Sequence, residues 1–271
     1  MNLKGKTALV LGAIKGLGRE IALDLAGSGA NVAVTYFDWE THLGALEAAL
    51  GQSGADHLIV RVNLLETEEI QHLIQTIIEQ FGRLDILINN IERGGWPVVH
   101  GSYLADQWDL EMETTLRAKR WVFDAAFPFL KTSGDGCVIN ISSIAGIVGR
   151  CGPARYMFND GYATANRGIG LLTETWARLG APEVRVNEIM LGLMATRHGE
   201  GTRGWGLLND GQKQALLDHT LLGRTGKAED VVKTVRFVLQ DAPFMTGSVI
   251  RLDGGYVLGG DKTGPMPKGV L

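Results

Sequence analysis

Hydrophobic and polar positions along this chain follow two alternating patterns. Short, mostly apolar runs are typical of buried strands, whereas longer stretches with apolar residues every three or four positions are typical of helices that bury one face. The short runs predict strands at Thr7–Leu11, Asn31–Tyr36, His57–Val62, Ile86–Asn89, Cys137–Ser142, Val184–Ile189 and Ser248–Leu252.

The longer stretches between these runs predict helices. From Glu66 to Phe81, one helical face collects Ile70, Leu73, Ile74, Ile77 and Ile78. The other helices are expected at Gly16–Gly27, after Thr41, from near Trp108, at Gly161–Leu179 and at Glu229–Leu239. Strands that alternate with helices build a parallel sheet covered on both faces. The fold class is therefore α/β, with a single doubly wound parallel sheet and helices on both faces.

One interval departs from this alternation. It runs from Thr196 to about Leu221, and its residues 198–206 are rich in glycine. A long irregular insertion beyond the carboxyl end of a strand is typical of a binding loop or lid. No repeat, low-complexity tract or linker interrupts the rest of the chain. We therefore expect residues 1–271 to form a single domain, with a substrate-loop insertion at about 196–221.

Composition and charge favour a protein with a buried core and argue against binding to nucleic acids or membranes. The 271 residues are 45% hydrophobic and 21% charged, which is ample material for a buried core. The formal net charge of -4 argues against general nucleic-acid binding, which needs a basic surface. No apolar run approaches the roughly 18 residues that a transmembrane helix requires.

Cysteine and histidine usage bears on the cellular compartment and on metal binding. The two cysteines, Cys137 and Cys151, cannot form a disulfide framework. The apolar stretch near the N-terminus is too short for a signal peptide. We therefore expect a cytoplasmic protein without a membrane partner. The histidines are scattered without the spacing of metal ligands, so no metal site is expected.

A glycine-rich turn joins the first predicted strand to the first predicted helix. Its glycines are Gly12, Gly16 and Gly18. Glycines in this position let backbone N–H groups approach a pyrophosphate, which then lies at the N-terminus of the helix. The turn therefore predicts a dinucleotide site. The alternative is that these glycines serve only close packing of the helix on the strand, and the strand–turn–helix context disfavours it.

This spacing, together with several later segments, resembles the short-chain dehydrogenase/reductase family, and within it the 3-oxoacyl-(acyl carrier protein) reductases. The matching segments are 84–90, 138–143, 185–187 with Gly192 and Thr196, 222–230 and 246–256. The resemblance runs almost end to end. It implies a Rossmann fold and an NAD(P)(H)-dependent oxidoreductase that reduces a ketone or 3-oxoacyl-type carbonyl group by hydride transfer.

The resemblance also implies which residues act on the carbonyl group. Ser143 matches the serine that hydrogen-bonds the carbonyl oxygen, and Thr115 stands where the family has an asparagine of a proton relay. Two residues compete for the role of the tyrosine that gives or takes the proton. Tyr156 lies at the family's usual distance after Ser143. Tyr162 aligns with the catalytic tyrosine when the count runs back from residues 185–187, and it is preferred.

One position departs from the family where the chemistry uses a charge. The family keeps a lysine four residues after the tyrosine, on the same helix face, and here that residue is Asn166. A phenol has an ordinary pKa of about 10, which a nearby cation lowers. Reduction needs the protonated phenol and oxidation the phenolate, so activity without the lysine favours reduction. The alternative function is a catalytically weakened or inactive relative that serves as a nucleotide-binding partner or sensor.

The expected cofactor site combines the ends of several predicted strands. The resemblance assigns to it Gly12, Lys15, Gly16, Leu17, Gly18, Tyr36, Phe37, Asn63, Leu64, Asn90, Gly192 and Thr196. Members that use NADP often keep a basic residue at the position of Lys15, so NADP(H) is preferred over NAD(H). The competing interpretation of Lys15 is a solvated surface lysine.

The resemblance also implies the partners. The substrate is a small-molecule carbonyl compound or alcohol, and the family's habit of assembly implies a homo-oligomer, either a tetramer or a dimer. Trp96, His198 and Trp205 fall in loops at the expected carboxyl edge of the sheet. They are candidates for lining the substrate, with plain loop packing as the alternative.

Overall fold

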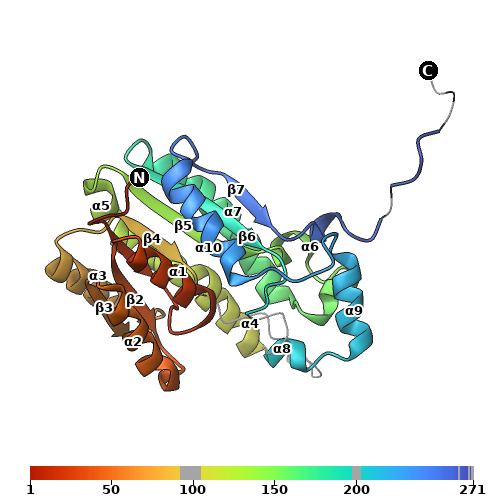
Figure 1. Ribbon diagram of the computed structural model, residues 1–271, viewed down its shortest axis with the longest axis horizontal. Coiled ribbons are helices and arrows are strands. Elements are labelled where there is room, and N and C mark those ends of the chain that lie inside the picture. Colours follow the sequence, from red (N-terminus) through yellow and green to blue (C-terminus); the bar gives the residue numbers. More distant parts are fainter. Residues whose placement is uncertain (92–104, 197–202, 262, 268, 270–271) are drawn as a thin grey trace.

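The computed structural model of the chain describes residues 1–91, 105–196, 203–261, 263–267 and 269, and a seven-stranded sheet lies at the centre of this described part (Figure 1). Every neighbouring pair of strands is parallel. The strands are β1 (Thr7–Val10), β2 (Asn31–Tyr36), β3 (His57–Arg61), β4 (Ile86–Asn89), β5 (Gly136–Ser143), β6 (Val184–Leu191) and β7 (Val249–Leu252). The predicted strands are all present, with ends within two residues of those expected.

The order of the strands creates a crevice in the middle of the sheet. The order is β3-β2-β1-β4-β5-β6-β7. The chain moves outward from β1 to β3 and then returns to place β4 on the other side of β1. The connections that follow β1 and β4 leave on opposite faces, so a crevice opens at the carboxyl ends of these two strands. The expected α/β fold of the Rossmann type is confirmed.

Helices cover both faces of the sheet (Figure 1). One face carries α1 (Gly16–Gly27), α2 (Leu43–Ser53) and α10 (Ala228–Arg236), and the other carries α3 (Thr67–Phe81), α5 (Ala118–Thr132) and α7 (Asp160–Gly180). Side chains of β1 and of the residue after it alternate between the two cores: Ala8 and Val10 face the first, Leu9 and Leu11 the second. Each large apolar side chain buried in these cores contributes about 1.5–3 kcal/mol.

The helix expected near Trp108 belongs to a longer helical path. It consists of α4 (Ala105–Met112), a π-helical turn (η2, Glu113–Arg117) and α5, in direct succession. A π-helical turn widens the helix locally and is frequent at functional sites. Here the widened turn carries Thr115, which the sequence placed at the candidate site.

The interval after β6 is more regular than its sequence suggests. It contains α8 (Arg203–Gly206) and α9 (Asp210–His219), so the expectation of a wholly irregular insertion is wrong for these residues. A capping box starts α9: Asn209 Oδ1 accepts a hydrogen bond from the Gln212 backbone N–H at 2.9 Å, and the Gln212 side chain accepts one from the Asn209 N–H at 3.0 Å. Asn followed by Gln three residues later is a helix-start signal that the neighbouring glycines obscured.

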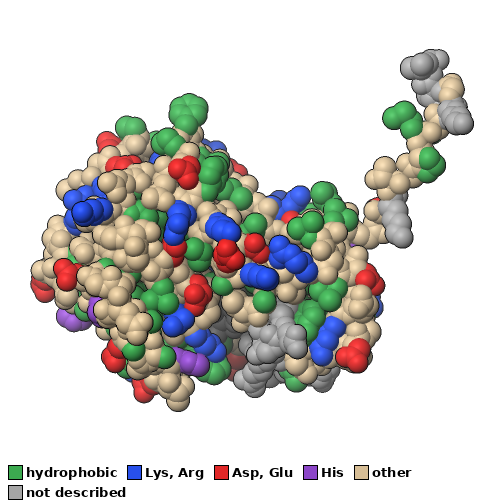
Figure 2. Space-filling view, in the orientation of Figure 1, with side chains coloured by type: hydrophobic (Ala, Val, Ile, Leu, Met, Phe, Trp, Pro, Cys, Tyr) green, Lys and Arg blue, Asp and Glu red, His purple; other side chains and the backbone are tan. Residues whose placement is uncertain are grey.

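Short helical segments and a charged surface complete the described structure. The segments are η1 (Glu40–His42), α6 (Ala145–Val148), η3 (Gly152–Tyr156), η4 (Phe237–Asp241) and η5 (Tyr256–Leu258). Around α10, side chains of opposite charge lie side by side (Figure 2), and Lys233 pairs there with Glu229 at 2.6 Å. Across the described ranges, no helix has the length and apolar character to cross a bilayer.

Candidate active site

The glycine turn between β1 and α1 keeps a backbone cradle open above the sheet. Gly12 and Gly16 have φ angles of 64° and 62°, in the left-handed region that favours glycine. A Cβ atom on Gly18 would lie only 2.4 Å from the Gly12 carbonyl oxygen and 2.6 Å from the Asn90 side chain. No side-chain cap closes the start of α1 at Lys15. The turn therefore fits a pyrophosphate bound by backbone N–H groups.

Asn90 and Thr35 hold this turn in shape from the two sides of β1: Thr35 lies on β2 and Asn90 directly follows β4. Asn90 Nδ2 donates to the carbonyl oxygens of Leu11 and Gly12, each at 3.3 Å. Thr35 Oγ1 accepts from the Gly12 N–H at 3.1 Å, and the Thr35 carbonyl oxygen accepts from the Ala13 N–H at 2.9 Å. The expected cofactor residue Asn90 thus acts in this structure as a brace of the glycine turn.

Aromatic and basic side chains gather at the end of β2. Tyr36 is half-buried and Phe37 is exposed. Lys15 Nζ lies 3.1 Å from the centroid of the Trp39 ring, and the Arg61 guanidinium lies 5.1 Å from that of Phe37. The sequence reasoning missed Trp39 and Arg61. Arg61 reaches this place because it pairs in register with Tyr36 across β2 and β3, which a linear pattern does not reveal.

Three further expected cofactor residues are anchored by their neighbours. Leu17, in the first turn of α1, packs against the core beneath that helix. Asn63 and Leu64 lie in the turn after β3, where the Asn63 N–H donates to Glu69 Oε2 at 2.7 Å. Leu64 packs against the core on the opposite face of the sheet. The structure therefore places all three next to the carboxyl edge.

The segment after β6 faces the glycine turn. Gly192 lies so close to Asp253 that a Cβ atom on Gly192 would be 2.6 Å from the Asp253 Cα. Farther on, Thr196 Cβ is 4.0 Å from the position that a Cβ on Gly16 would take. The expected cofactor residue Thr196 therefore lies close to the glycine turn, and Gly192 follows the carboxyl end of β6, against Asp253.

Ser143 and Tyr162 come from two elements that pack together at the same edge. Ser143 ends β5 and is 4% exposed, and its Oγ accepts a hydrogen bond from the Ala145 N–H at 3.1 Å. Tyr162 lies in the first turn of α7 and is 1% exposed. It belongs to the same buried cluster as Ile144 and Ala145, the two residues after Ser143. The structure thus brings the serine and the tyrosine segment together.

Tyr156 has different surroundings. It lies in η3 and is half-buried. Its hydroxyl oxygen accepts a hydrogen bond from Arg155 Nη2 at 2.8 Å, and the Arg155 guanidinium lies 4.8 Å from the ring centroid. The alternative tyrosine is thus paired with a neighbouring exposed arginine, whereas Tyr162 is enclosed.

A buried chain of hydrogen bonds positions the start of α7. Asn159 is the N-cap residue, and its Oδ1 accepts from the Tyr162 backbone N–H at 2.8 Å. Asn159 Nδ2 donates to Glu111 Oε1 at 2.5 Å, and Glu111, on α4, is 5% exposed. The sequence reasoning missed both residues, although Asn just before a helix is a recognised start signal. The chain ties α4 to the backbone of Tyr162.

Asn166 and Thr115 are fully buried near this helix start. Asn166 Nδ2 donates to the Tyr162 carbonyl oxygen at 2.9 Å. Asn166 Oδ1 and Thr115 Oγ1 have no hydrogen-bond partner among the described residues. Their segments pack closely, since a Cβ on Gly168 would lie 3.1 Å from the Leu116 side chain. Unpartnered buried polar atoms indicate a place suited to the hydroxyl groups of a ligand.

Comparison with known proteins identifies the family to which this arrangement belongs. Residues 12–257 match the family model described as Enoyl-(Acyl carrier protein) reductase. A 3-oxoacyl-[acyl-carrier-protein] reductase of Staphylococcus aureus is 31% identical over 258 residues, which cover 93% of this chain and 98% of that protein. The chain belongs to the short-chain dehydrogenase/reductase family. The equivalent reductase of Thermotoga maritima is 29% identical over 262 residues, which cover 95% of this chain and 100% of that protein.

Solved structures of short-chain dehydrogenase/reductases share the fold. A putative short-chain alcohol dehydrogenase from Sinorhizobium meliloti has a TM-score of 0.82 at 27% identity, covering 95% of this chain and 98% of that one. A putative short-chain dehydrogenase/reductase from Burkholderia xenovorans has a TM-score of 0.81 at 24% identity, with 94% and 98% covered, and supports the fold alone. The chain is an oxidoreductase of this family, as its sequence predicted.

This short-chain dehydrogenase/reductase also contains two buried charges that the sequence reasoning missed. Lys119, on α5, is 1% exposed, and its Nζ donates to the Ile141 carbonyl oxygen at 2.6 Å. Glu188, on β6, is fully buried and accepts a hydrogen bond from Ser142 Oγ. Burial raises the pKa of the Glu188 carboxyl. The Ser142 hydrogen bond and the charges of Lys119 and Arg167 lower this pKa but do not offset the burial.

An apolar layer from the segment after β6 packs against Tyr162. Trp205 of α8 and Leu216 of α9 belong to the same buried cluster as the tyrosine. The side chain of Trp205 is 9% exposed. That Trp205 lines the substrate stays a prediction, and the other two candidates, Trp96 and His198, lie outside the described residues.

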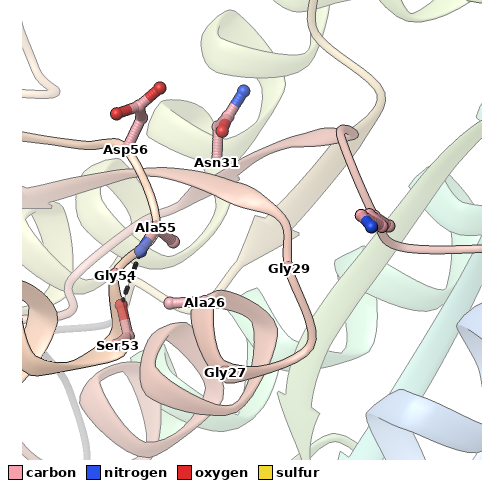
Figure 3. Close-up of a pocket in the computed structure, with 9 residues that line it drawn as sticks. Ala26, Gly27, Gly29, Asn31, Ser53, Gly54, Ala55 and Asp56 are labelled. Atoms are coloured by element: carbon pink, nitrogen blue, oxygen red, sulfur yellow. Dashed lines mark hydrogen bonds between the residues drawn. The ribbon is translucent and has the colours of Figure 1, made fainter.

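A separate hollow lies at the opposite, amino edge of the sheet (Figure 3). It is lined by Lys4, Ala26, Gly27, Gly29, Asn31, Ser53, Gly54, Ala55 and Asp56. The Ala55 N–H donates to Ser53 Oγ at 3.3 Å, and Asn31 and Asp56 point away from this hydrogen bond. Ligands of open α/β sheets bind at the carboxyl edge. We therefore place the candidate active site at the glycine turn and not in this hollow.

Proposed function

We propose that this protein reduces the carbonyl group of a ketone or 3-oxoacyl-type substrate with NAD(P)H as the hydride donor. The observation that carries the proposal is the burial of Tyr162 against the segment that follows Ser143, at the sheet edge that also bears the glycine turn. The names of the Staphylococcus aureus and Thermotoga maritima relatives support a 3-oxoacyl substrate class.

Ser143 and Tyr162 provide the polar groups for the substrate oxygen. The coenzyme, bound at the glycine turn, supplies a hydride to the carbonyl carbon. Ser143 Oγ accepts from the Ala145 N–H at 3.1 Å, which leaves its own proton to donate to the carbonyl oxygen. The Tyr162 hydroxyl then donates the proton that converts this oxygen to an alcohol. The apolar layer that includes Trp205 excludes water from the reacting atoms.

We infer that Asn166 biases the reaction toward the alcohol. Asn166 is buried and hydrogen-bonded to the Tyr162 carbonyl oxygen, but its amide carries no charge. A neutral neighbour gives no electrostatic support to a phenolate, which only the oxidation direction requires. Both directions are to be measured on one substrate at pH 7, with the overall equilibrium taken into account. Equal chemical-step rates in the two directions would contradict the inference.

We propose NADP(H) as the preferred coenzyme. Two cations, Lys15 and Arg61, lie over the aromatic side chains at the end of β2, where a 2′-phosphate would be bound. Fluorescence titration is expected to give a lower dissociation constant for NADPH than for NADH. Arg61→Ala is expected to reduce this difference. A protein that binds NADH at least as tightly as NADPH would overturn the preference.

A pair of tyrosine substitutions tests the proposed reaction. Tyr162→Phe removes the proton donor and is expected to lower kcat about 100-fold or more, the usual contribution of a general acid. Tyr156→Phe is the matched control, because its hydroxyl is engaged by Arg155, and we expect it to stay within about twofold of the unmodified protein. The assay follows NADPH consumption with ketones and 3-oxoacyl thioesters. Coenzyme binding without turnover would instead support a nucleotide-binding partner or sensor.

We propose a homo-oligomer built from single-domain subunits, residues 1–271, in which the segment at about 196–221 contacts the substrate. Large apolar side chains are exposed on α5 and α7: Trp121 is 39%, Leu171 68% and Leu179 54% exposed. Exposed apolar residues on neighbouring helices suit burial against a second copy of the chain. Light scattering after size exclusion is expected to give a dimer or tetramer mass, and Leu171→Glu is expected to lower it.

A further inference from the structure

The Trp39 side chain lies against a lysine of the glycine turn. Lys15 stands between Gly12 and Gly16 as the N-cap residue of α1, and its Nζ lies 3.1 Å from the centroid of the Trp39 ring. Both side chains are exposed to solvent, Trp39 to 52%. An ammonium group over the face of an indole ring is attracted by the ring electrons. Lys15 interacts with other groups as well, so the indole face fixes one side of its ammonium group.

Trp39 has a backbone conformation that bulky residues avoid. Its φ angle is 68° and its ψ angle 36°, in the left-handed region, and among the described residues it is the only non-glycine residue with a positive φ. Neighbouring contacts hold this segment in place. The His42 N–H donates to the Trp39 carbonyl oxygen at 2.9 Å, and Glu40 pairs with Arg61 at 3.0 Å. Backbone strain of this kind is concentrated at ligand-binding sites.

The contact between the two side chains lies where the adenosine half of a dinucleotide would bind. Thr35, on β2, hydrogen-bonds the N–H groups of Gly12 and Ala13, so the end of β2 adjoins the glycine turn. Trp39 follows three residues after the end of β2. In dinucleotide-binding folds, this place receives the ribose 2′ group, and a cation there accommodates a 2′-phosphate. The Lys15 ammonium group is therefore in a position to bind that phosphate.

An unrestrained lysine side chain loses conformational freedom when it binds a phosphate, because its long stem has several rotatable bonds. The indole ring already restricts the ammonium group in the unbound protein, so less freedom remains to be lost on binding. We propose that Trp39 determines coenzyme specificity by positioning Lys15 for the 2′-phosphate, which favours NADPH over NADH. Trp39 is a positioning residue, since it acts through Lys15. This inference rests on the function and the coenzyme preference proposed above.

Two substitutions of Trp39, one of Lys15 and a matched control test the proposal. Trp39→Asn removes the ring and introduces a residue that adopts left-handed backbone readily. Trp39→Phe keeps an aromatic face. Lys15→Met removes the ammonium group, alone and together with Trp39→Asn. Phe244→Asn, in the loop before β7, removes a fully exposed aromatic side chain and is the control.

The first measurement is the selectivity ratio, defined as the dissociation constant for NADH divided by that for NADPH, from fluorescence titration. Trp39→Asn is expected to lower this ratio about two- to fivefold, which corresponds to the usual strength of an exposed cation–π contact. Trp39→Phe is expected to recover part of the loss, and Phe244→Asn to leave the ratio unchanged. In the Lys15→Met background, Trp39→Asn is expected to cause no further change, because the ring acts through the ammonium group.

The second measurement uses ligands without nicotinamide, so it requires no turnover. Adenosine 2′,5′-bisphosphate and adenosine 5′-monophosphate are compared by calorimetric titration. Trp39→Asn is expected to weaken binding of the bisphosphate by the same roughly two- to fivefold and to leave binding of the monophosphate unchanged. Equal weakening of both ligands would show that the ring contacts the adenine instead of positioning Lys15, and would overturn the proposal.

Different results decide the inference and the proposed function. If the unmodified protein prefers NADPH and Trp39→Asn leaves the selectivity ratio unchanged, this inference alone fails. If the unmodified protein binds NADH at least as tightly as NADPH, the coenzyme preference and this inference fail together. Turnover with NADH that Tyr162→Phe abolishes would in that case leave the reductase function standing.

Discussion

Two buried carboxylates at opposite edges of one sheet have contrasting surroundings. Asp85, just before β4 at the amino edge, accepts hydrogen bonds from Arg83 at 2.6 and 2.7 Å, from Lys6 Nζ at 3.1 Å and from the Thr7 N–H at 2.9 Å. Burial acts to raise the pKa of Asp85, but these donors and cations outweigh it, so the pKa lies below its ordinary value. At the carboxyl edge, burial prevails and the pKa of Glu188 is raised.

The difference separates a buried carboxylate that is fully paired from one that is only partly paired. Asp85 has its charge matched within the chain, which joins β1 to β4. Glu188 Oε2 has no hydrogen-bond partner among the described residues, and neither have Asn166 Oδ1 and Thr115 Oγ1. Incomplete pairing of buried polar groups costs stability and persists where a binding site needs those groups. The two edges are therefore expected to respond differently to substitution.

The largest effect is expected at the amino edge. Asp85→Asn leaves the surrounding cations without their buried partner and is expected to cost about 3–5 kcal/mol of unfolding free energy at pH 7. The lowered pKa means that Asp85 contributes stability above the ordinary carboxyl pKa and loses it as the pH falls through its own. The stability gap to the Asn variant should therefore narrow in acid. Urea unfolding at several pH values measures it.

The exposed Asp56→Asn serves as the control for this experiment. It is expected to change stability by less than about 0.5 kcal/mol. NADPH affinity should stay the same in Asp85→Asn at temperatures where the variant is folded. A clear loss of coenzyme affinity there would show that the two edges are coupled.

The next effect is expected at the glycine turn. A Cβ in Gly18→Ala would collide with the Gly12 carbonyl oxygen at 2.4 Å, so the turn must shift. Overpacking of this kind costs about 1–3 kcal/mol, which corresponds to roughly 5–150-fold in NADPH affinity if the strain falls on the bound form. Calorimetric titration is the measurement. Gly27→Ala at the other end of α1, where a Cβ meets nothing within 4 Å, is the control and should bind normally.

A smaller effect is expected from the helix cap beside Tyr162. Asn159→Ala removes the N-cap of α7 and the donor to buried Glu111, and we expect a loss of about 1–2 kcal/mol together with reduced kcat. Asn209→Ala removes the exposed cap of α9 and should cost about 1 kcal/mol or less. Thermal unfolding and NADPH oxidation assays compare the two. Equal losses of both stability and kcat in the two variants would show that the link to Tyr162 has no special role.

The smallest effect concerns Glu188. Its raised pKa means that the folded protein favours the protonated carboxyl, so this group costs stability as the pH rises above its ordinary value of 4.5. Glu188→Gln is expected to be more stable than the unmodified protein at pH 8, with the difference disappearing near pH 4. The exposed Glu47→Gln is the control and should show no such gap. A Gln variant that is less stable at pH 8 would show that Glu188 is needed as the partner of Lys119.

Much of the fold was predictable because its signals are local. Mostly apolar runs such as 86–89 are buried because exposing them to water is unfavourable. The glycine turn is recognisable because it needs positive φ angles, which residues other than glycine rarely adopt. The helix Asp210–His219 was missed although its capping pair is local, because the glycines before it dominate the composition of the segment. Lys119 and Glu188 are charged residues inside otherwise apolar patterns. The sequence shows this interruption, but it does not show which groups either side chain contacts.

The order of residues along the chain was enough to predict the parallel sheet and the family, which are confirmed, whereas the dinucleotide turn and the missing charge at Asn166 stay predictions. Periodicity and backbone sterics act over a few neighbours, so a linear pattern records them. The chain alone did not reveal that Arg61 reaches the end of β2, that Asn159 links Glu111 to Tyr162, or that Lys119 hydrogen-bonds the Ile141 carbonyl oxygen. Those contacts join segments far apart in sequence, and only the packing of strands and helices decides which side chains meet.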